Sequence, residues 1–118
     1  MAYDEDFANR IREELANVDG MSEKSMFGGR AFLLHGNMAV GIMSTGELMV
    51  RVGPDGADDA LSKPHTRLFE MRGRSMTGWV IVALEGLKTK RQLGPWVNRG
   101  VTFASSLPPK GGTKSARG

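Results

Sequence analysis

The chain of 118 residues contains no cysteine. This absence excludes a disulfide framework, a thiolate metal site and a thiol nucleophile, and it is typical of proteins that stay in a reducing compartment. Long apolar runs are also missing, because each is strand-length and falls well short of the ~20 residues of a membrane helix. The first residues are acidic and do not resemble a secretory signal peptide. We therefore expect a cytoplasmic protein without membrane association.

Residues that carry catalysis are scarce. The two histidines, His35 and His65, stand next to turn residues and have no carboxylates at a matched spacing. No Gly-x-Ser-x-Gly elbow is present, and the segment 26–29, Met-Phe-Gly-Gly, lacks the Gly-Lys-Ser/Thr ending of a phosphate loop. The sequence predicts no cofactor, no metal and no catalytic residue, and it favours a non-enzymatic protein.

Basic charge is concentrated at the C-terminus. Residues 108–118 contain three bases, no acid and many Gly, Pro, Lys and Ser residues. We interpret them as a disordered basic tail that follows a single domain of residues 1–107. That domain is neutral as a whole, but residues 1–23 hold seven acids and two bases, whereas residues 24–107 have a net charge of +5. This asymmetry allows a basic face on the fold beside an acidic first helix.

Apolar residues at spacings of three and four predict an amphipathic helix from Asp4 to Asp19, with Asp4 as its cap and Gly20 as its stop. Apolar runs separated by glycine turns then predict an antiparallel meander. The predicted strands are Ser25–Phe27, Arg30–His35, Met38–Met43 and Glu47–Val52. A short helix at Ala57–Ser62 should end before Pro64.

Two further strands are predicted at Arg67–Met71 and Trp79–Leu84, joined by a loop or a bulged continuation over residues 72–78. The final segment from Leu87 is helical, and Pro95 requires that this helix either starts near Gly94 or bends there. Strands grouped in this way, rather than alternating with helices, indicate an α+β fold with a mainly antiparallel sheet.

Strand alternation predicts which side chains share a face. In the strand 47–52, one face carries Leu48, Val50 and Val52 and the other carries Met49 and Arg51. In the strand 38–43, one face carries Met38, Val40 and Ile42 and the other carries Ala39 and Gly41. Both faces are fairly apolar, so we expect both to be covered at least in part.

Three segments resemble the N-terminal domain of the TfoX/Sxy competence regulators. They are Lys24-Ser25-Met26-Phe27-Gly28-Gly29 leading into Ala31-Phe32, the strand 46–51, and Gly73-Arg74-Ser75-Met76 to Trp79 followed by the helix that ends in residues 103–108. The similarity covers residues 4–108, as in stand-alone members of this family. It implies a secretion-chaperone-like fold in the order helix, three strands, short helix, two strands, helix. It also implies a role in competence regulation, which in the better-known members involves a second, C-terminal domain.

The candidate binding residues lie near the glycine turn and on basic strand or loop positions. The segment 26–29 is either a core Met-Phe pair that closes into a tight turn or part of a partner-binding edge beside Lys24 and Arg30. Arg51 is either solvated or ion-paired on its strand, or it binds an anion together with Arg72 and Arg74. The candidates are Lys24, Met26, Phe27, Gly28, Gly29, Arg51, Arg72 and Arg74.

Methionine is abundant, with eight residues in the chain. Six scatter over different predicted strands and loops: Met26, Met38, Met43, Met49, Met71 and Met76. They are either adaptable core filler or a soft, exposed docking surface. We favour a domain that acts through protein–protein contact, in transcriptional or competence regulation, with a homodimer also expected. The alternatives are a nucleic-acid-binding accessory protein and a small anion-binding protein or enzyme that uses Arg51 and Arg74.

Overall fold

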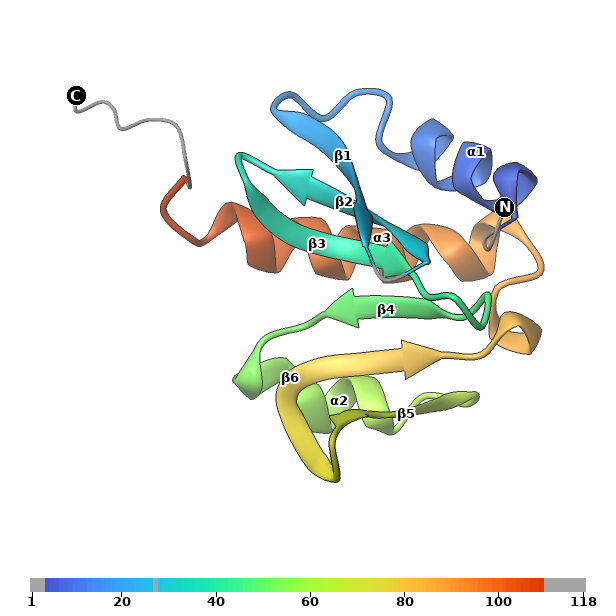
Figure 1. Ribbon diagram of the computed structural model, residues 1–118, viewed down its shortest axis with the longest axis vertical. Helices are drawn as coiled ribbons and strands as arrows, with labels where there is room; N and C mark the ends of the chain where they lie inside the picture. The colour runs from blue at the N-terminus through green and yellow to red at the C-terminus, as the bar shows by residue number, and fades with distance from the viewer. Residues whose placement is uncertain (1–3, 27, 110–118) are drawn as a thin grey trace.

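The computed structural model describes residues 4–26 and 28–109, and it confirms an α+β fold with a six-stranded antiparallel sheet and three α-helices (Figure 1). The elements in chain order are α1 (Glu5–Glu14), β1 (Met21–Met26), β2 (Gly29–Leu34), β3 (Asn37–Ile42), β4 (Leu48–Arg51), the 3-10 helix η1 (Pro54–Gly56), α2 (Ala57–Leu61), β5 (Thr66–Met71), β6 (Arg74–Val82), the 3-10 helix η2 (Leu84–Gly86) and α3 (Lys90–Ser105). This order roughly matches the arrangement that the sequence predicts.

The strands lie in the order β1-β2-β3-β4-β6-β5, and all neighbours are antiparallel. The first four strands form a meander, as the glycine turns predict. After β4, η1 and α2 carry the chain past the position of β6 to the edge strand β5 (Figure 1). The β5–β6 hairpin then returns the chain to pair with β4, so segments distant in sequence form the centre of the sheet.

All three helices pack on one face of the sheet around a single core. The strands contribute Phe32, Val40, Ile42, Leu48, Val50, Val80 and Val82, and the helices contribute Phe7, Ala8, Ile11, Ala57, Ala60, Leu93, Trp96 and Val97. Burial of this apolar surface is the main term that holds the helices in place. The opposite face of the sheet carries none of the described helices, although the sequence predicts partial cover on both faces.

The helix limits differ from the predicted ones for local reasons. Asp4 caps α1 as predicted, because its carboxylate accepts a hydrogen bond from the Asp6 N–H at 2.9 Å. The helix ends at Glu14 instead of Asp19, because turns follow it and the chain reverses at Gly20, which has a φ of +87°. The reversal lets β1 start at Met21, four residues before its predicted start.

In the second half of the chain, the structure decides between alternatives that the sequence leaves open at two places. The helix α3 starts at Lys90 and Pro95 lies inside it, so a start near Gly94, one of the two alternatives that the sequence leaves open, is excluded. A capping box between Thr89 and Gln92 satisfies the first turn and fixes this earlier start. The strand β6 begins at Arg74 and includes most of the predicted linker, with an irregular register to β5.

A β-bulge changes the face of one methionine. Phe32 lies opposite Val40, but the next residue of β2, Leu33, lies opposite Met38, so Ala39 is an extra residue in β3. Ala39 therefore packs toward the helices with Leu34 and Ala104. The prediction that Met38 shares a face with Val40 and Ile42 is wrong, because the bulge turns Met38 to the opposite face.

Candidate functional site

The helix-free face of the sheet contains an apolar groove. Across the middle of this face, one row of residues lies in register from β1 to β5: Lys24, Ala31, Gly41, Met49, Ile81 and Arg67. The interior of the row is apolar, and its residues Ala31 and Gly41 are small and buried. Small residues between larger ones leave a hollow, which we call the methionine groove.

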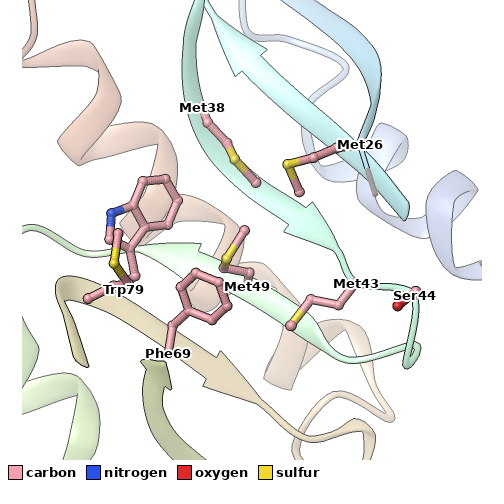
Figure 2. A pocket seen from close by; sticks show the side chains of 8 residues that line it. Met26, Met38, Met43, Ser44, Met49, Phe69 and Trp79 are labelled. Carbon is pink, nitrogen blue, oxygen red and sulfur yellow. The ribbon is translucent and has the colours of Figure 1, made fainter. Parts of the chain in front are cut away.

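The groove has a volume of about 360 Å³ and side chains from five strands and one loop line it (Figure 2). The lining residues are Met26, Met38, Met43, Ser44, Met49, Phe69, Met76 and Trp79. Two of the methionines converge over β3, because a Cβ atom built on Gly41 would lie 2.4 Å from Met38 Cε and 3.5 Å from Met26 Cε. The absence of a side chain at Gly41 lets the thioether tip of Met38 lie directly against the sheet.

The groove changes from buried to exposed across its width. Met49 is only 5% exposed and Ile81 is 2% exposed, although none of the described helices covers them, so the other side chains of this face shield them. Met76 at the rim is 36% exposed. Because unbranched thioether chains repack at little cost, a groove lined by five methionines can adapt to the shape of what it contacts.

Arg51 marks one end of the groove. Its guanidinium carbon lies 5.0 Å from the centre of the Trp79 ring and 5.5 Å from that of Phe103. Cross-strand pairing places Arg51 directly opposite Trp79, which itself lines the groove. This cation–π stack holds both side chains in a fixed orientation. Met49 and Arg51 therefore lie on the groove face of β4, whereas Leu48 and Val50 lie on the helix face in the core. This arrangement confirms the predicted facing of the strand.

The other candidate residues from the sequence occupy different places. Lys24 and Met26 lie on the same face of β1, and Met26 lines the groove. Phe27 lies outside the described residues. Gly28, with a φ of +81°, lies in the β1–β2 turn, and Gly29 begins β2, where a Cβ atom would overlap the Ile42 carbonyl oxygen. These glycines are therefore explained by backbone geometry.

Arg72 and Arg74 lie in the β5–β6 hairpin, Arg72 with a φ of +54° in its turn and Arg74 at the start of β6. Both are exposed. In the part of the chain that the structure describes, no contact joins either residue to Arg51. The anion site formed by these three arginines remains a prediction from the sequence.

Arg30, expected beside the glycine turn, belongs to a half-buried charge cluster on the helix side of the sheet. Glu23 accepts hydrogen bonds from Arg12 Nε at 2.7 Å, from Arg12 Nη2 at 2.8 Å and from Arg30 Nε at 3.0 Å. The Arg12 hydrogen bonds lower the pKa of Glu23 to about 2, Arg30 adds to this effect, and partial burial opposes it. The cluster joins α1 to the edge strands β1 and β2, so its role is structural.

The structure offers little support for chemistry at other positions. His35 and His65 are exposed residues in left-handed turn conformations, as the sequence predicts for surface histidines. Within residues 4–26 and 28–109, no group of three or more His, Cys, Asp or Glu side chains is placed to hold a metal ion. No described helix is long and apolar enough to cross a membrane.

Sequence reasoning identifies only part of this groove. The abundance of methionine is the signal that points to it, and the docking-surface interpretation had Met26, Met38, Met43, Met49 and Met76 among its residues. The pattern missed Phe69 and Trp79, which join the groove only because the β5–β6 hairpin returns to pair with β4. No local pattern around either aromatic residue could have placed them beside the methionines of β3.

The chain was compared with protein-family models, with curated proteins and with solved structures. The family model described as the TfoX N-terminal domain matches residues 13–104 of the chain. Neither the curated proteins nor the solved structures contain a match. The matched range begins within α1 and ends within α3, and it therefore includes every strand of the sheet and the entire groove lining.

Proposed function

The chain belongs to the TfoX N-terminal domain family, and we propose that it is a non-enzymatic domain that acts through protein–protein contact in transcriptional or competence regulation. The methionine groove on the helix-free face of the sheet is the observation that carries this proposal. A partly exposed apolar surface of this kind is typical of interaction sites in soluble domains.

The architecture suits a docking platform. The floor of the groove is a sheet whose other face is packed against three helices, so the strands themselves are held rigidly. The walls are flexible methionine side chains, together with Phe69 and the Trp79 indole that Arg51 fixes in place. Because the sheet is rigid and the methionine side chains are flexible, the groove can bind an apolar protein surface with little backbone rearrangement.

The groove lining does not favour catalysis. Of the described residues that line it, Ser44 is the single polar one, and no histidine or carboxylate accompanies it. A general acid or base must lie within hydrogen-bond reach of the reacting group. Protein contact therefore fits this lining better than a reaction does.

Site-specific photocrosslinking tests the proposal. A photoreactive benzoylphenylalanine is placed at Met76, on the groove rim, or at Leu84, which is 47% exposed and lies in η2 outside the groove. Each tagged chain is irradiated in cytosol from its source cells, with nuclease present and at low and high salt. We expect the same defined protein adduct from position 76 under both salt conditions, and we expect it to be absent from position 84.

Three further results of this experiment have clear meanings. A Met49→Asp substitution combined with the position-76 probe should abolish the adduct, provided that circular dichroism shows the variant folded; Leu84→Asp should preserve it. Equal adducts from positions 76 and 84 would overturn the groove as the contact site. Recovery of nucleic acid that is lost with salt would instead support the nucleic-acid-binding alternative.

A further inference from the structure

We infer that the methionine groove binds an acidic amphipathic α-helix of a different protein. This inference rests on the proposed function and adds the chemistry of the partner. Three observations carry it: the charges around the groove, the hydrogen bonding of the strands below it, and the burial of the helices in this chain.

The charges that flank the groove are basic and come from three strands. Lys24 of β1 shares a face with Met26, Arg51 of β4 stacks on Trp79, and Arg74 of β6 precedes Met76 by two residues. By strand alternation, each cation lies on the groove side of the sheet. None of the three forms an ion pair with another residue in the described part of the chain.

Acidic side chains offset these three cations only in part, because among the described strand residues Glu70 of β5, which is exposed, lines a neighbouring hollow with Met43 and Phe69. Glu47 directly precedes β4 and by alternation lies on the groove face, but its carboxylate already accepts hydrogen bonds from Arg67 at 2.6 and 2.7 Å. Glu23 lies on the helix face and is bonded to Arg12. The surroundings of the groove are therefore basic, and they complement a partner whose apolar stripe is bordered by Asp or Glu.

The hydrogen bonding of the sheet favours a helix over a strand as the occupant. The groove lies over β3, β4 and β6, and each of these strands already pairs with a neighbour on both sides. An extended segment would find no free backbone groups there, and its own would remain unpaired in an apolar groove. A helix satisfies its backbone internally and presents only side chains.

A second copy of this chain is a poor occupant. The apolar faces of α1 and α3 are buried in their own core, as are Ala57 and Ala60 of α2, so no described helix has a free apolar stripe. Two groove faces brought together would also oppose the cations Lys24, Arg51 and Arg74 of each copy. The occupant therefore belongs to another protein.

A synthetic peptide of about 18 residues, or five helical turns, is a direct probe. It carries Leu and Met at positions i, i+3, i+4 and i+7, is bordered by Glu, and is stapled to stay helical. One control peptide replaces every Glu by Lys, and another has the same composition without the helical period. Binding to the full chain is followed by NMR of ¹³C-labelled methionine methyl groups.

We expect the Glu peptide to shift the methyl signals of Met26, Met38, Met43, Met49 and Met76. Met21, which packs against the core on the helix side, is the internal control and should not shift. The double variant Lys24→Glu/Arg74→Glu should weaken binding about tenfold, from the usual strength of exposed charge pairs. Lys90→Glu/Arg91→Glu, an equal charge change on exposed positions of α3, should leave binding unchanged.

Equal binding of the Glu and Lys peptides, absence of binding by the Glu peptide, or shifts outside the groove would each overturn the inference. Concentration-dependent groove shifts without peptide would show that a second copy covers this face, which also overturns it. The proposed function fails separately: it fails if position 76 captures no protein in cytosol, whatever the synthetic peptides do.

Discussion

Glu23 should make the stability of this protein dependent on acid pH. Glu23 lies in β1, and its carboxylate accepts hydrogen bonds from Arg12 of α1 and Arg30 of β2. These hydrogen bonds lower the pKa of Glu23 from an ordinary value of 4.5 to about 2. Because the pKa is lower in the folded chain than in the unfolded chain, the stabilisation is present above pH 4.5. It is lost as the pH falls toward 2.

The magnitude follows from the same difference. Without solvent screening, the difference in the pKa of Glu23 between the folded and unfolded chain would contribute about 3 kcal/mol to the free energy of unfolding. The Glu23 side chain is 25% exposed and that of Arg12 is 34% exposed, so solvent screens the pair. We therefore expect Glu23→Gln to lower the free energy of unfolding by about 1–2 kcal/mol at pH 7, and by much less at pH 2.

Urea unfolding followed by far-UV circular dichroism at several pH values between 7 and 2 measures this effect. The matched control is Glu85→Gln, which removes one exposed carboxylate outside the cluster and should shift stability by less than about 0.5 kcal/mol. A difference between wild type and Glu23→Gln that stays constant from pH 7 to pH 2 would refute the reasoning, because it would show that the charge of Glu23 does not carry the contact.

Further substitutions test the close packing of the sheet. Gly100→Ala should destabilise the chain by about 1–3 kcal/mol, because its Cβ would lie 2.4 Å from a main-chain oxygen of β3 that cannot move aside. Gly41→Ala should cost less than Gly100→Ala in the same urea titration, because the tip of Met38 can rotate away; an equal cost would contradict this view of the groove. Asn37→Ala should cost about 1 kcal/mol in thermal unfolding, because the buried amide donates a hydrogen bond to the Pro108 carbonyl at 2.8 Å, and an unchanged Tm would show that this contact contributes nothing.

The sequence predicts the elements of this fold well where apolar periodicity and turn residues act together. The alternation around Val50 and the apolar face of α3 from Leu93 to Ala104 both predict the observed core. The limits of elements are less accurate where capping decides them, as at Thr89, whose capping box extends α3 ahead of Pro95. A capping box acts over a single turn of helix, and here it outweighs the usual preference of proline for the first position of a helix.

The groove is harder to predict than the fold because it depends on contacts between distant segments. The sequence singles out Met26 and Arg51, but it cannot show that Phe69 and Trp79 line the same groove as Met26 or that Trp79 stacks on Arg51, since that requires the order of the strands. The bulge at Ala39 is similarly hidden, because a strict period of two is the natural expectation for a run such as 38–43. The proposed partner site therefore emerges only from the assembled sheet.

The extra residue at Ala39 has a consequence for how this segment tolerates change. Substitutions in β3 alter single side chains, but a deletion in the regular part of the strand, such as that of Gly41, reverses the facing of every residue on one side of it. Deleting Ala39 would remove the bulge and leave Leu33 opposite Met38 and Phe32 opposite Val40 in a regular ladder, so Met38 would keep its place on the groove face and only the contacts of Ala39 with Leu34 and Ala104 would be lost. A deletion scan of this strand would therefore distinguish Ala39 from its neighbours, a difference that a substitution scan overlooks.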